Sequence, residues 1–173
     1  MDLFNSTTHG ELILSEVIKH IKYFLEEDPE AEYSLVVGTD SQERTIAGNG
    51  LPRGKAGKKM VQLISAIVVH RKGFGGKYFW QKSASIEVHS LREKIYAETF
   101  ASLDLAGVFV PMLKKSLNGK SPHYYLEIHV DVGEHGETRE MIKEVVGMVT
   151  GNGYVAKTKP QAYGASYVAD KHT

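Results

Sequence analysis

The stretch Val36-Val37-Gly38-Thr39-Asp40 places an acidic residue directly after a run of apolar and β-branched residues. The run from Tyr33 to Thr39 has the composition of a short buried strand. Asp40 then stands at the carboxyl end of that strand, where open α/β sheets usually place their ligands. A turn is the competing interpretation, because Asp-Ser is a common turn pair, and position alone favours the turn.

The segments around this strand follow the two regular hydrophobic patterns. Apolar residues three and four positions apart predict helices over Glu11 to Glu27, from Ser90 to the region of Pro111, from about Glu137 to Thr150, and from Ala162 to about His172. Runs rich in β-branched and aromatic residues predict strands over Tyr33 to Thr39, Met60 to His70, Lys77 to Ile86, Tyr124 to Val130 and near Tyr154 to Ala156.

The order of these elements predicts the fold class. Three leading strands without helices between them indicate an antiparallel meander, whereas the later strands alternate with helices and indicate parallel crossovers. We therefore expect an α/β domain with a mixed five-stranded sheet, three strands antiparallel and then two parallel, flanked by helices and preceded by an extra N-terminal helix. A chain of 173 residues is long enough for one such domain, over residues 1–173, and too short for two.

Composition narrows the chemistry. Lys plus Arg and Asp plus Glu both total 21, so a polyanionic partner has to meet a local patch rather than a global positive field. With no cysteine, a metal has to be held by oxygen or imidazole ligands. The first ten residues do not resemble a secretion signal, and no apolar run approaches the roughly 20 residues that span a bilayer. We therefore expect a cytoplasmic protein without a membrane partner.

Three further carboxylates stand where packing alone would not place them. Glu98 lies on the apolar stripe of its helix, and a lone buried Glu is costly unless it is paired or bound to metal. Asp131 closes a strand as Asp40 does, and Asp170 lies on the last helix near Tyr167. Each has an ordinary alternative: a solvated edge of the stripe for Glu98, a loop or helix cap for Asp131, and a solvated last turn for Asp170.

Gathering four carboxylates has an energetic consequence. Two like charges 4 Å apart repel by about 1 kcal/mol in water and by about 4 kcal/mol at an effective dielectric constant near 20. A divalent cation reverses that sign, and two oxygen-ligated ions activate water for attack on a phosphodiester. Oxygen ligands favour Mg²⁺ or Mn²⁺ over zinc.

The chain resembles the ribonuclease H-like superfamily, and within it the uncharacterised YkuK-type branch of predicted nucleases. The motifs that carry the resemblance are Val37-Gly38-Thr39-Asp40-Ser41-Gln42, Ala97-Glu98-Thr99-Phe100-Ala101-Ser102-Leu103, His129-Val130-Asp131-Val132-Gly133, Lys157-Thr158-Lys159-Pro160, Tyr163-Gly164-Ala165-Ser166 and Ala169-Asp170. This resemblance implies that Asp40, Glu98, Asp131 and Asp170 are the catalytic and metal-binding residues. The helix before the first strand departs from the minimal family pattern. In related enzymes a His near the last carboxylate assists it, and His172 is either such a residue or a frayed tail.

Side chains outside the carboxylate set suggest how nucleic acid is held. The segment from Gln42 to Lys59 is predicted to be a long loop, and its basic residues are suited to gripping phosphates; they are Arg44, Arg53, Lys55, Lys58 and Lys59. A solvated hairpin tip is the alternative. Tyr78 and Trp80 either stack bases or pack on the sheet, and His129 shares strand parity with Asp131.

The sequence thus predicts a nuclease that uses two Mg²⁺ or Mn²⁺ ions to hydrolyse RNA or DNA. The alternative is a catalytically inactive module of the same fold that binds nucleic acid or protein. An actin-like ATPase would need two such domains. RNA, DNA and hybrid substrates, endo- and exonucleolytic cutting, and the oligomeric state all remain open at this point.

Overall fold

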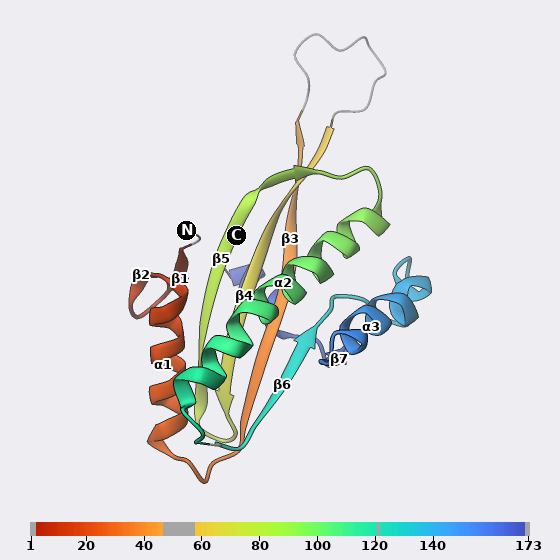
Figure 1. The fold of residues 1–173 in the computed structure, drawn as a ribbon. Coiled ribbons are helices and arrows are strands. Elements are labelled where there is room, and N and C mark those ends of the chain that lie inside the picture. The colour runs from red at the N-terminus through yellow and green to blue at the C-terminus, as the bar shows by residue number, and fades with distance from the viewer. Residues whose placement is uncertain (1–2, 47–57, 121, 172–173) are drawn as a thin grey trace, which may run out of the picture.

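The computed structural model describes residues 3–46, 58–120 and 122–171, and it folds them around one twisted sheet (Figure 1). Within these ranges the sheet has seven strands in the order β2-β1-β5-β4-β3-β6-β7. The strands are β1 (Phe4–Ser6), β2 (Gly10–Leu12), β3 (Tyr33–Ile46), β4 (Lys58–Arg71), β5 (Gly75–Glu87), β6 (Tyr124–His129) and β7 (Val155–Lys157). The helices are α1 (Leu14–Glu27), α2 (Leu91–Leu117), η1 (Arg139–Met141), α3 (Ile142–Gly151) and α4 (Gly164–Lys171).

The expected α/β class and strand directions are present, but the expected number of strands was wrong. Strands β3, β4 and β5 pair antiparallel, while β6 pairs parallel with β3 and β7 parallel with β6. The two additional strands, β1 and β2, form a hairpin whose first strand pairs with β5 through Asn5 and Trp80. At three residues each, they are too short to show a period in the sequence.

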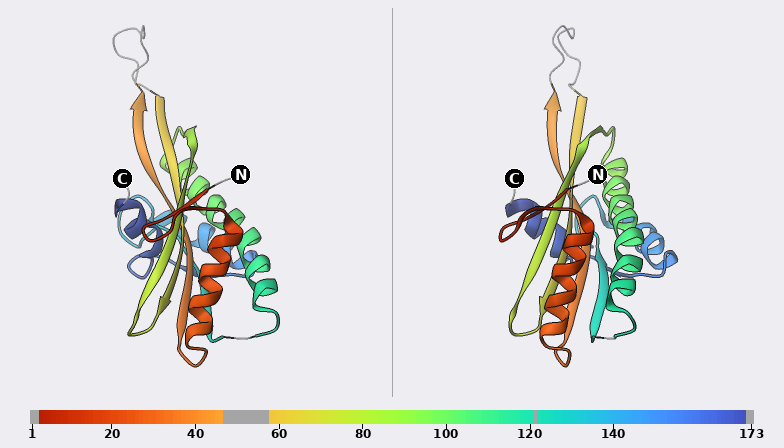
Figure 2. Two further views of the ribbon diagram at one scale, coloured as in Figure 1. Left: turned by 90° about the vertical axis from the view of Figure 1, so that its left-hand side faces the viewer. Right: turned by 60° about the vertical axis from the view of Figure 1, so that its left-hand side comes forward.

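The helices cover the two faces of the sheet unequally, as Figure 2 shows from two sides. Helices α1, α2 and α3 share one large core with the sheet, which includes Ile21, Phe109 and Val145. On the other face, Val168 of α4 packs in a smaller cluster with Ile64, Ala66 and Trp80. The sheet is therefore buried on both sides of its centre, which explains the long apolar runs of its central strands.

Several boundaries differ from those expected. Strand β3 continues past Asp40 to Ile46, and β4 begins at Lys58, so both ends of the predicted loop are strand. Helix α1 begins at Leu14, because Gly10–Leu12 belong to β2. Helix α2 runs through Pro111 to Leu117, and the Ser90 side chain caps its first turn by accepting a hydrogen bond from the Glu93 N–H.

By length and composition, α2 is also apolar enough to cross a membrane, which the sequence analysis did not anticipate. The same test is passed by helices that are buried in a core. Ile95, Phe109 and Leu113 of α2 are buried in the main core. The apolar character of α2 is thus accounted for by its contacts within the fold.

A seam of buried hydroxyls joins α2 to the sheet. Thr39 Oγ1 lies 2.8 Å from Ser65 Oγ on β4 and 2.9 Å from Ser102 Oγ on α2. Ser102 Oγ also lies 3.1 Å from the Glu98 carbonyl oxygen one turn earlier. All three hydroxyl side chains are buried. A buried polar group that loses its partner costs about 1–3 kcal/mol, so the seam depends on being complete.

We therefore expect Thr39→Val, which keeps the shape and removes the hydroxyl, to lower the free energy of unfolding by about 1–3 kcal/mol. Urea denaturation followed by circular dichroism measures this change. Thr45→Val is the matched control, since Thr45 is exposed on the same strand. Equal losses in the two variants would contradict a stabilising role for the seam.

Candidate functional site

The site forms where β6 stops pairing with β3. The last pair of residues in their parallel register is Gly38 and His129. Asp40 and Asp131 each follow that pair by two residues in the sequence. Both carboxylates lie close enough to Glu98 for their negative charges to raise its pKa, so the three acids share one neighbourhood.

The sequence predicted Asp40 at the end of its strand or in a turn, and neither prediction is correct. Strand β3 continues to Ile46 by pairing with β4, and Asp40 is the register partner of Ile64. What ends near Asp40 is the neighbouring strand β6. The Asp40 Oδ1 atom accepts a hydrogen bond of 2.7 Å from the Ser41 N–H.

Glu98 reaches the same neighbourhood from α2. Its side chain is 2% exposed, as expected from its place on the apolar stripe of the helix. The Ser41 hydroxyl donates a hydrogen bond of 2.6 Å to Glu98 Oε1. The pKa of Glu98 is raised to about 7, chiefly by burial and also by the negative charges of Asp40 and Asp131, while Ser41 and Lys94 oppose the rise.

Lys94 supplies positive charge one helical turn before Glu98. Its Nζ lies 4.0 Å from Glu98 Oε1 and 3.1 Å from Glu43 Oε1. Burial lowers the pKa of Lys94, but the carboxylates of Glu98, Glu43 and Asp40 outweigh that effect, so the pKa of Lys94 is raised. The ammonium group is therefore a charged counter-ion for the acidic neighbourhood.

Asp131 has a similar partner from the segment after β7. Lys159 Nζ lies 2.8 Å from Asp131 Oδ1 in an ion pair. The buried Oδ1 atom thus has an ammonium group as its counter-ion.

Asp170 and His172 are the remaining predicted acid and its neighbour. Asp170 belongs to α4, but its side chain lies outside the described residues, as does His172. Strand β3 and α4 are in contact. The convergence of Asp170 with the other three acids stays a prediction.

The donors present fit a hard divalent cation in kind. Asp40, Glu98 and Asp131 offer only carboxylate oxygens, the ligands that Mg²⁺ and Mn²⁺ prefer. Among the side chains that the structure describes, no three Asp, Glu or His lie together as a ready-made metal site. Lys94 and Lys159 instead balance the charge of Glu98 and Asp131.

Three of the five basic residues predicted to contact phosphate lie on strands, and the other two lie outside the described residues. Arg44 lies on β3, and Lys58 and Lys59 lie on β4, all three exposed on strands rather than in a loop. Lys58 also forms an ion pair of 2.8 Å with Glu87. Arg53 and Lys55 lie outside the described residues.

His129 has a structural role at the start of α4. Its Nδ1 accepts hydrogen bonds of 3.1 Å from the backbone N–H groups of Tyr163 and Gly164, at the start of α4. Burial lowers the pKa of His129, against the opposing effect of Glu127, whose Oε2 lies 3.2 Å from Nε2. A neutral imidazole with an acceptor nitrogen is what these two N–H donors require.

Ser41 and Lys94 are the contacts that sequence reasoning missed. Both carried a signal: Ser41 directly follows Asp40, and Lys94 precedes Glu98 by four residues, the spacing of neighbours on one helix face. The sequence does not show that Ser41, rather than Asp40, points toward α2.

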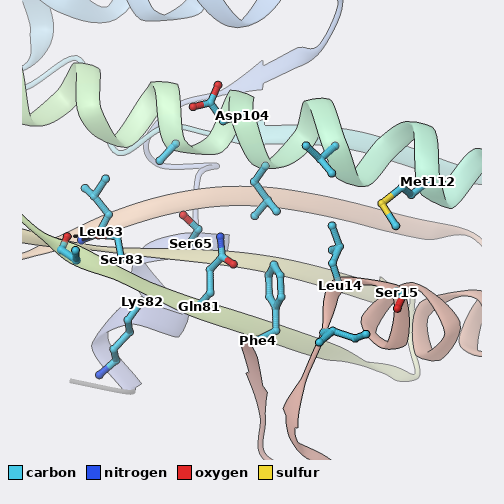
Figure 3. A pocket seen from close by; sticks show the side chains of 15 residues that line it. Phe4, Leu14, Ser15, Leu63, Ser65, Gln81, Lys82, Ser83, Asp104 and Met112 are labelled. Atoms are coloured by element: carbon cyan, nitrogen blue, oxygen red, sulfur yellow. Dashed lines mark hydrogen bonds between the residues drawn. The ribbon is translucent and has the colours of Figure 1, made fainter. Parts of the chain in front are cut away.

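A cavity of about 630 Å³ lies between α2, β5 and the first hairpin, away from the predicted acids (Figure 3). Phe4, Leu14 and Met112 line the cavity. Figure 3 shows the side chains of Asp104 and Lys82 pointing away from it. Asp40, Glu98 and Asp131, the predicted acids whose side chains the structure describes, do not line this cavity. It therefore adds nothing to the candidate site.

An α/β fold with a mixed sheet flanked by helices fits the ribonuclease H-like fold. The chain belongs to that family, because the family model described as "Ribonuclease H-like" matches residues 16–173. It is also 29% identical over 180 residues to the uncharacterized protein YkuK of Bacillus subtilis (strain 168), covering 99% of this chain and 96% of that protein. No solved structure matches the chain. Family membership supports a nuclease-type or nucleic-acid-binding function in general terms.

The raised pKa of Glu98 predicts a pH-dependent stability. Between its ordinary pKa of 4.5 and its folded value of about 7, the folded state holds a proton that the unfolded state releases. The free energy of unfolding therefore falls by about 3 kcal/mol as pH rises from about 4.5 to about 7. Above that range, Glu98 causes no further change with pH. Glu98→Gln removes the effect.

Chemical denaturation of the wild type and Glu98→Gln at pH 5 and pH 8, both in EDTA, measures the difference. We expect the variant to gain about 2–3 kcal/mol relative to the wild type on going from pH 5 to pH 8. A difference between the two proteins that is the same at both pH values would show that Glu98 ionises as it does in water.

Proposed function

We propose that this protein is a divalent-metal-dependent nuclease that hydrolyses phosphodiester bonds of RNA or DNA. The observation that carries the proposal is the buried carboxylate of Glu98, which accepts a hydrogen bond from Ser41 and whose pKa is raised by burial and by the nearby charges of Asp40 and Asp131. The negative charges of Asp40 and Asp131 disfavour ionisation of Glu98, and a bound divalent cation would relieve that repulsion. Membership of the ribonuclease H-like family is consistent with this chemistry.

Each residue has a definite part in the proposal. Asp40, Glu98 and Asp131, with Asp170 as a fourth ligand, would hold two Mg²⁺ or Mn²⁺ ions. When bound, such ions activate water and stabilise the attacking and leaving oxygens. Ser41 orients the Glu98 carboxylate through its hydrogen bond. Lys94 and Lys159 balance the negative charge until the cations arrive.

Nucleic acid is the partner that this chemistry requires. The net charge is zero, so attraction has to be local. The paired ends of β3 and β4 carry Arg44, Lys58 and Lys59, and Arg53 and Lys55 follow in the segment between them. We propose that these basic residues contact phosphates.

The ion pairs at the site favour one alternative function, that of an inactive binding module. Lys94 and Lys159 already neutralise Glu98 and Asp131. If their ammonium groups are permanent counter-ions, the protein is an inactive ribonuclease H-like module that binds nucleic acid or protein. Isothermal titration with Mn²⁺ separates the two functions: binding that is lost in Asp40→Asn supports the nuclease, and no detectable binding supports the inactive module.

We expect Asp40→Asn to reduce Mn²⁺-dependent cleavage by about a hundredfold or more, since it removes a charged ligand without changing the shape of the side chain. Purified protein is assayed against RNA, DNA, hybrid and branched substrates. Asp104→Asn is the matched control, because Asp104 is an exposed acid on the same helix as Glu98. Equal activity of wild type and Asp40→Asn on every substrate that is cut would refute the role of the site.

A further inference from the structure

The sheet face covered by α4 carries an aromatic groove that the carboxylate site does not use. The groove has a volume of about 430 Å³ and lies between α4 and the strands β4 and β5. Its lining includes Val68, Tyr78, Tyr163 and Tyr167. Tyr163 and Tyr167 are 49% and 70% exposed, so much of each ring is open to a ligand.

Two of these rings are already ordered by their neighbours. The ring of Tyr163 meets the buried His129 ring nearly edge-on, with 4.9 Å between centroids. The ring of Tyr78 lies against Trp80, with 5.6 Å between centroids. A side chain that is ordered before binding loses less conformational entropy when a ligand arrives.

A lysine lies at the edge of the groove. Lys171 Nζ lies 5.6 Å from the centre of the Tyr78 ring. Among the lining side chains that the structure describes, there is no Asp or Glu. Lys77 also lines the groove, but its ammonium lies over Phe24, in the core of the opposite face. Aromatic rings beside a cation suit a ligand with flat bases and negative phosphates.

Helix α4 runs from this groove toward Asp40. At its start, a Cβ on Gly164 would lie 2.5 Å from the Val36 side chain of β3. One turn later, Val168 packs with Ile64, the register partner of Asp40. The α4 helix thus follows β3 from Val36 to Asp40.

Two groove tyrosines and Lys171 form a stripe along α4. Tyr163, directly before the helix, and Tyr167 and Lys171 on it recur every four residues, a spacing that puts them on one side of the helix. The four residues from Val36 to Asp40 span about 13 Å at roughly 3.3 Å per strand residue. That distance corresponds to about four stacked nucleotides at roughly 3.4 Å each.

We propose that the groove binds single-stranded nucleic acid, with bases stacked on Tyr163 and Tyr167 and a phosphate near Lys171. The direction of the strand, from the groove toward Asp40, rests on the proposed nuclease function. The inference deepens that function by naming unpaired strands as the substrate class. Bases in a duplex are already stacked on their neighbours and leave the rings without a partner.

Binding of fluorescently labelled single-stranded RNA and DNA, measured by anisotropy in EDTA, tests the proposal. We expect Tyr163→Ala and Tyr167→Ala each to weaken binding by roughly five- to a hundredfold, the range for loss of one stacked base. Tyr163→Phe and Tyr167→Phe keep the ring and should bind within about twofold of the wild type. Tyr23→Ala is the control, because Tyr23 is 61% exposed on α1, on the opposite face.

Three results would overturn the proposal: no binding of single strands by the wild type, alanine variants that bind as the wild type does, or equal affinity for the matching duplex. Circular dichroism establishes that each variant is folded. Because EDTA removes divalent ions, the outcome does not depend on cleavage. If the tyrosine variants lose binding but the wild type cleaves no substrate, the binding groove is supported and the proposed nuclease function is refuted. If the wild type cleaves nucleic acid but the tyrosine variants bind as the wild type does, the nuclease function is supported and the binding groove is refuted.

Discussion

The unequal length of two neighbouring strands is the constraint on which the candidate site depends. Strand β3 is paired with β4 up to Ile46, but its pairing with β6 ends at Gly38. Beyond His129 the chain turns away: Val130 donates to Lys157 O, and Lys159 donates to Val132 O. One edge of β3 is thereby released from β6, and side chains from α2 and from the chain after β6 can approach Asp40.

The burial of Glu98 is the energetic cost of this arrangement. A carboxylate that is 2% exposed resists ionisation, which the pKa of about 7 expresses. The Ser41 hydroxyl and the Lys94 ammonium offset part of this cost. The hydroxyl seam around Thr39 begins one turn further along α2, so polar contacts continue from the site into the core. Glu98 thus lies at the end of a polar strip inside an otherwise apolar contact.

The placement of Glu98 could be predicted from the sequence, whereas that of Asp40 could not. Helical periodicity places Glu98 between the buried residues Ile95 and Ser102, and the structure buries it as expected. After Asp40, however, β3 continues with Ser41, Gln42, Glu43 and Arg44, which have no apolar period. Their strand conformation comes from pairing with β4, a long-range contact that local patterns do not contain.

The hairpin β1 and β2 was missed for a similar reason, because each strand is too short for a pattern and is defined only by its partner. Pro111 predicted a helix end or kink that is too early, because α2 continues to Leu117. Proline removes one N–H and usually breaks or kinks a helix. In α2 the neighbours Phe109, Val110 and Leu113 are buried in the core, and this packing continues the helix to Leu117.

His129 links the two regions to which function is assigned. It is the last residue of β6 to pair with β3, and so it marks where the release of β3 begins. Its Nδ1 also accepts the two N–H groups that open α4, while its ring supports Tyr163. Gly164 allows this close approach, since a Cβ there would meet Val36 at 2.5 Å and His129 Nδ1 at 3.3 Å. The start of α4, and with it the groove and the helix that carries Asp170, is therefore positioned by the same residue that ends the pairing of β6.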